Sequence, residues 1–93
     1  MPHFKIAHIH EQGQDMIIVP LESSFGNLLT GEQEATIAEL QIRSRGADLR
    51  GTVVPVWNSG GRMAFIAPRP WHPFFEHMNL QWVAHNLNRE LYW

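Results

Sequence analysis

The strands that this sequence predicts are apolar on both faces, and this feature constrains the fold more than any other. The runs MIIV (16–19), VVPV (53–56) and MAFIA (63–67) carry apolar side chains at odd and even positions alike. A sheet with one face in water would instead alternate apolar and polar residues. Both faces therefore need cover. If helices cover one face, the other needs the segment 68–78, the aromatic stretch 91–93 or a second subunit.

Local signals divide the chain into four strands and two helices. Glycine-containing turns at 11–14 and 58–61 predict two hairpins. Thr30 as N-cap and Gln33 at the third helical position form a capping-box pattern that opens the first helix. Asn79 is a favourable N-cap for the second, whose apolar stripe has helical spacing. The predicted ranges are 3–10, 15–21, 52–57 and 62–67 for strands, and 31–45 and 79–91 for helices.

Length and composition predict a single α+β domain over residues 1–93. A chain of 93 residues is too short for a second core. We therefore expect a two-layer sandwich of order ββαββα, in which two β-hairpins carry two helices packed on one face. The chain has no cysteine, which excludes disulfides and thiolate metal sites. With no signal-peptide pattern and no apolar run long enough for a membrane span, we expect a soluble cytoplasmic protein.

The stretch APRPWHPFFEHM (67–78) concentrates prolines, aromatic residues and histidines. In one interpretation its prolines fix an extended path and its aromatic rings fold back over the second sheet face. In the other it is a recognition or dimer surface, because Trp and Arg are enriched at interfaces. The residues of that partner or dimer surface would be Arg69, Trp71, His72, Phe74 and Phe75.

Two histidines on one strand are the weak candidates for a metal site. His8 and His10 share a strand face, since side chains repeat every two residues. A site would need a third ligand, for which His72, His77 and His85 are available. No serine lies in a nucleophile-elbow motif, and no carboxylate pair stands out. We therefore predict no catalytic residue, no metal, no cofactor and no enzymatic activity.

Arg43, Arg45 and Arg50 form a local basic cluster near the end of the first helix. Their simplest role is to compensate the helix dipole and to remain solvated. The alternative is phosphate contact beside exposed tryptophans, as in single-strand binders. The formal net charge of −2 argues against strong affinity for duplexes.

Three segments together, KIAHIHEQGQDMIIVPLESSFG, GTVVPVWNSGGRMAFIAPRPWHPFF and NLNRELYW, carry a likeness over nearly the whole chain. In them the sequence resembles a family of short uncharacterised proteins carried by integrative and conjugative elements of proteobacteria. The resemblance implies a bacterial cytoplasm and a mobile-element context. It carries over no catalytic or binding residue.

These observations rank three functions. The first is a small non-catalytic protein-interaction module that forms a homodimer. The second is a nucleic-acid-binding accessory protein that uses Arg43, Arg45, Arg50, Arg69 and Trp71. The third is a small metal-dependent enzyme built on His8 and His10.

Overall fold

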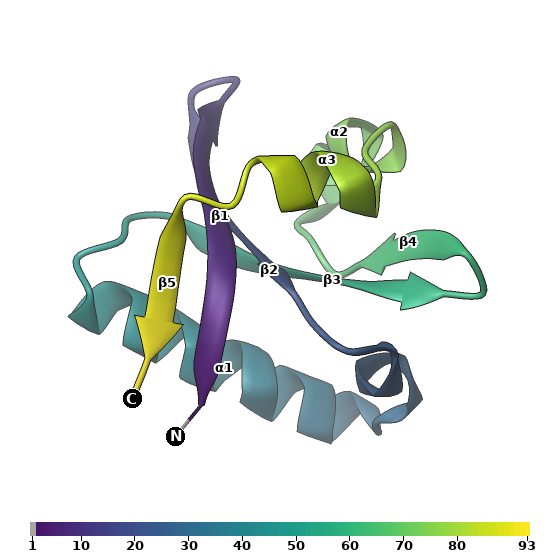
Figure 1. Cartoon of the computed structure of the whole chain (residues 1–93), viewed down its shortest axis with the longest axis horizontal. Coiled ribbons are helices and arrows are strands. Elements are labelled where there is room, and N and C mark those ends of the chain that lie inside the picture. The colour runs from purple at the N-terminus through teal and green to yellow at the C-terminus, as the bar shows by residue number, and fades with distance from the viewer. Residues whose placement is uncertain (1) are drawn as a thin grey trace.

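The computed structural model describes residues 2–93 as a five-stranded sheet with the strand order β4-β3-β2-β1-β5 (Figure 1). The antiparallel strands β1 (His3–Glu11) and β2 (Gln14–Pro20) form the first hairpin. The second consists of β3 (Thr52–Ser59) and β4 (Arg62–Phe65). β2 and β3 are parallel neighbours, and the chain between them contains the long helix. The α+β class and both predicted hairpins are confirmed.

The long helix α1 (Thr30–Gly46) agrees closely with the predicted range 31–45. It follows the short 3-10 helix η1 (Ser23–Asn27). Its N-cap is Leu29 and not Thr30, so the predicted cap is wrong by one residue. Glu32, now the third helical residue, accepts a hydrogen bond from the Leu29 N–H at 3.1 Å. In a capping box, the side chain of the third helical residue likewise accepts a hydrogen bond from the backbone N–H of the N-cap residue.

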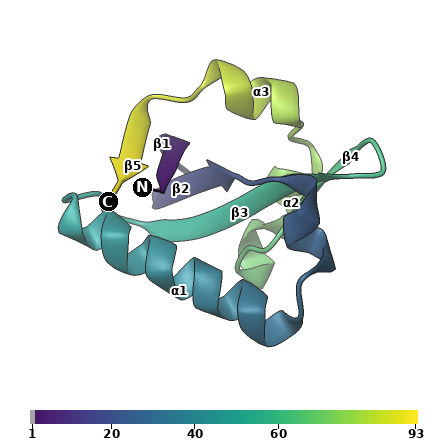
Figure 2. The same cartoon turned by 60° about the horizontal axis from the view of Figure 1, so that its bottom comes forward.

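α1 covers one face of the sheet, as Figure 2 shows. Leu40 of α1 is buried against Ile6, Ile17 and Val53, which come from three neighbouring strands. Val19, Leu49 and Leu91 complete this first core cluster.

The segment after β4 covers the opposite face, so the two predicted helices do not share one face. It forms the 3-10 helix η2 (Arg69–Trp71) and the short helices α2 (His72–Glu76) and α3 (Leu80–His85). Phe75 of α2 and Val83 of α3 are buried against Ile18, Val54 and Val56 of the sheet. Adjacent strand residues such as Ile17 and Ile18 thus enter different clusters, which explains the two-sided apolar strands. The expectation of a single helix layer and one core is wrong, because this segment supplies a second layer.

The predicted helix over 79–91 is wrong beyond His85. Asn79 does cap α3, accepting a hydrogen bond from the Trp82 N–H at 2.8 Å. After α3 the chain turns and adds a fifth strand, β5 (Arg89–Tyr92), antiparallel to β1. Leu87 packs on the second cluster while Leu91 is buried in the first. A continuous helix could not reach both sides of the sheet.

No helix within residues 2–93 has the length and apolar character needed to cross a membrane.

Candidate functional site

The 67–78 stretch is mainly a cover over the second sheet face. Phe75 is 1% exposed and its ring packs 5.5 Å from that of Phe65, between centroids. Its assignment to a partner or dimer surface is therefore wrong, because the sheet itself uses this side chain. Trp71 and Phe74 are half-buried against the same cluster. Of the five residues predicted for that surface, only Arg69 is exposed.

His72, the remaining residue of that surface, is also half-buried and engaged within the chain. A ring nitrogen, Nε2, lies 3.0 Å from the Ala67 carbonyl oxygen, and the ring stands edge-on to Phe65. These contacts hold the start of α2 against the end of β4. They leave less of the imidazole for a metal or a partner.

A hollow of about 580 Å³ lies beside this stretch, between the β1–β2 turn and the helices. Its apolar wall includes Trp82, which is 36% exposed. Its lining also includes two titratable side chains, those of Glu11 and His77. The lining residues are Glu11, Gln12, Pro73, Phe74, His77, Met78, Asn79 and Trp82.

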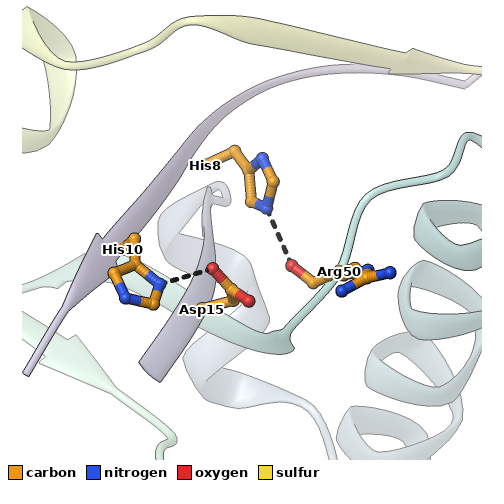
Figure 3. Close-up of polar contacts among 4 residues, drawn as sticks. All are labelled: His8, His10, Asp15 and Arg50. Carbon is orange, nitrogen blue, oxygen red and sulfur yellow. Dashed lines mark hydrogen bonds and ion pairs between the residues drawn. The ribbon is translucent and has the colours of Figure 1, made fainter. Parts of the chain in front are cut away.

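The two histidines of β1 make separate contacts instead of meeting at one point (Figure 3). The Nε2 atom of His8 lies 2.7 Å from the Arg50 carbonyl oxygen, in the loop after α1. The Nδ1 atom of His10 lies 2.8 Å from Oδ1 of Asp15, its cross-strand neighbour on β2. Within residues 2–93, no three His, Cys, Asp or Glu side chains are grouped so that they could hold a metal ion.

The basic cluster is partly committed to contacts within the chain. The Arg43 guanidinium lies 5.0 Å from the centre of the Trp93 ring, and its Nε is 3.1 Å from a carboxylate oxygen of Glu39. Arg45 and Arg50 are exposed. Arg43 thus stabilises the packing of α1 on the end of β5, which is a structural use of the residue.

Exposed apolar side chains lie along β5 and the last turns of α1. A groove of about 440 Å³ runs between them. Tyr92 is 69% exposed and Ile42 is 60% exposed, and both line this groove. Trp93 forms another part of the wall, where it stacks on Phe4. β5 is also an edge strand, so its outer backbone groups have no strand partner within residues 2–93.

This surface was not predicted, because the helical spacing of the apolar residues placed 89–91 in a helix. Two asparagines, Asn86 and Asn88, could have indicated the break, since asparagine is a poor residue for a helix interior. The side-chain amide of Asn88 pairs with the backbone of β1, as the backbone of a neighbouring strand would. Its Oδ1 accepts from the His8 N–H at 2.8 Å, and its Nδ2 donates to the His8 carbonyl at 2.9 Å.

Comparison of the chain with protein-family models, with curated proteins and with solved structures found no match.

Proposed function

We propose that this protein is a small non-catalytic protein-interaction module that self-associates as a homodimer. The observation that carries the proposal is the exposure of Ile42 and Tyr92 beside one unpaired strand edge, Ile42 on the α1 side and the Tyr92 ring on the side of His3. Water-exposed apolar surface of this kind is a common feature of association sites. The charged fraction of 17% is low for a globular protein, so fewer charged side chains interrupt such a surface.

The contacts of the arginines favour this proposal over nucleic-acid binding. Arg43 is shared between Glu39 and Trp93, so a phosphate would have to compete with a carboxylate for it. The net charge of −2 gives no general attraction for a polyanion. The cytoplasmic location and mobile-element context implied by the family resemblance remain predictions that accompany the proposal.

Sedimentation velocity on the full chain, up to high micromolar concentration, tests self-association. We expect a monomer–dimer equilibrium whose Kd rises about tenfold in Ile42→Ser and in Tyr92→Ser, the size of effect typical of an interface anchor. Leu29→Ser is the matched control, because Leu29 is 74% exposed at the other end of α1. This variant should dimerise like the wild type.

Two results would count against the proposed surface or function. A chain that stays monomeric at every concentration contradicts self-association. A dimer that Trp82→Ser weakens while Ile42→Ser does not would place the contact at the hollow beside the 67–78 stretch.

A further inference from the structure

The free edge of β5 exposes the backbone groups of alternate residues, and the neighbouring contacts show which ones. In an antiparallel pair, successive residues turn their N–H and C=O groups to opposite sides of the strand. The Trp93 N–H donates to the Pro2 carbonyl, and the Asn88 amide bonds the backbone of His8. Even-numbered residues of β1 therefore face β5. By the register of this pair, Arg89, Leu91 and Trp93 face β1 in return.

Glu90 and Tyr92 must then direct their N–H and C=O groups outward, to the open edge. A strand that adds to this edge can form hydrogen bonds only with these two residues. Its side chains on the α1 side would enter the groove lined by Ile42, Gly46 and Ala47. This combination of free edge and flanking apolar groove is what strand addition requires.

We infer that the added strand is β5 of a second copy, antiparallel, with a twofold axis at Leu91. This inference rests on the proposed self-association and specifies its geometry. In this register Glu90 lies opposite the partner's Tyr92, and Tyr92 lies opposite the partner's Glu90. All the outward backbone groups of both residues are then paired across the axis.

The competing register, centred on Glu90, is less favourable for two reasons. It places Glu90 opposite the partner's Glu90, and like charges directly opposite destabilise a sheet. It also places Tyr92 opposite the partner's Asn88, whose N–H already donates to the Ile6 carbonyl. The Leu91-centred register has neither defect.

Side chains on both faces of the paired edge are complementary in the Leu91-centred register. On the α1 side, Leu91 stays buried in its own core, and Arg89 lies opposite the partner's Trp93, where a cation–π contact is favourable. On the other side, the Glu90 carboxylate lies opposite the phenol of the partner's Tyr92.

A proline substitution tests the outward backbone groups. Glu90→Pro removes an N–H that β1 does not use, and proline is tolerated on the solvent side of edge strands. Its matched control is Glu90→Ala, which removes the same carboxylate but keeps the N–H. We expect Glu90→Pro to raise the dimer Kd at least about tenfold relative to Glu90→Ala, because two intersubunit hydrogen bonds are lost. Far-ultraviolet circular dichroism of both variants checks that the fold is retained.

Single cysteines test the register, and the cysteine-free chain gives no background. Glu90→Cys and Tyr92→Cys chains are mixed in equal amounts, oxidised and analysed by mass spectrometry. Directly opposite hydrogen-bonded residues have Cα atoms about 5.5 Å apart, within disulfide range. We expect the mixed Glu90→Cys/Tyr92→Cys disulfide to exceed both like-with-like disulfides together by severalfold.

The outcomes separate this inference from the proposed function. The β5 pairing is overturned if Glu90→Pro and Glu90→Ala give the same dimer Kd, or if the disulfides formed are mainly like-with-like. Either result leaves the proposed self-association intact. A wild-type chain that is monomeric throughout overturns both.

Discussion

Replacing Phe75 with alanine tests whether the 67–78 stretch is structural cover. Phe75 is 1% exposed, and its ring lies 5.5 Å from Phe65 and 5.2 Å from Phe74, between centroids. Truncating a buried phenylalanine to alanine costs about 3–5 kcal/mol, through lost transfer free energy and the cavity that remains. A domain of this length has a free energy of unfolding of about 5–14 kcal/mol. Phe75→Ala should therefore remove about a fifth or more of the total stability.

Urea denaturation followed by circular dichroism measures this loss as a shift of the midpoint at a nearly constant slope. Arg69→Ala is the control, because Arg69 lies in the same stretch and is exposed. It should change the free energy of unfolding by no more than about 0.5 kcal/mol. A loss below about 1 kcal/mol for Phe75→Ala would refute the reasoning, since it would mean that the second sheet face does not depend on this ring.

Three further substitutions test individual contacts by the same denaturation assay. Ser44→Ala should raise the free energy of unfolding by about 0.5–1 kcal/mol, because Ser44 is fully buried and its Oγ has no hydrogen-bond partner; a decrease would show that the hydroxyl is satisfied. Gly51→Ala should lower it by at least about 1–3 kcal/mol, since Gly51 has φ +127° and a Cβ there would meet the Asp15 main chain; unchanged stability would contradict that close approach. Asn88→Ala should cost about 1–3 kcal/mol and accelerate amide exchange in β5, because it removes both bonds to the His8 backbone; unaltered exchange would argue against this role.

Much of the fold could be predicted from the sequence where local signals agree with the tertiary structure. Glycine turns at Gly13 and Gly60 define the two hairpins, and both glycines have positive φ. The strands with apolar side chains at both odd and even positions predicted that each sheet face would be covered. The 67–78 segment, one of the covers predicted, buries the second face through Phe75, together with Val83 of α3.

The predicted second helix is wrong where strand pairing outweighs the helical spacing of the apolar residues. Leu80, Val83, Leu87 and Leu91 have helical spacing, but Leu91 belongs to the opposite core. Backbone pairing with β1, aided by the Asn88 side chain, converts the last part of that stripe into a strand. No local rule for helices includes this long-range partner.

The candidate site was predictable only in part. The two-residue repeat of a strand correctly placed His8 and His10 on one face. Their hydrogen-bond partners, however, lie in the loop after α1 and on β2. The predicted interaction surface was placed on the 67–78 stretch, where Arg69 is exposed but Trp71, His72, Phe74 and Phe75 are half-buried or buried. Ile42 and Tyr92 lie 50 positions apart in the chain, and only the formation of β5 brings them to one groove.

Amide hydrogen exchange at Glu90 and Tyr92, measured by NMR over a range of protein concentrations, tests the central claim most directly. In the monomer both N–H groups face water, whereas Leu91 and Trp93 donate toward β1. We predict that exchange at Glu90 and Tyr92 slows as concentration rises, while exchange at the outward-facing amide of Met63 on β4 does not change. Equally fast exchange at Glu90 and Tyr92 at every concentration, in a sample shown to be dimeric, would contradict the claim.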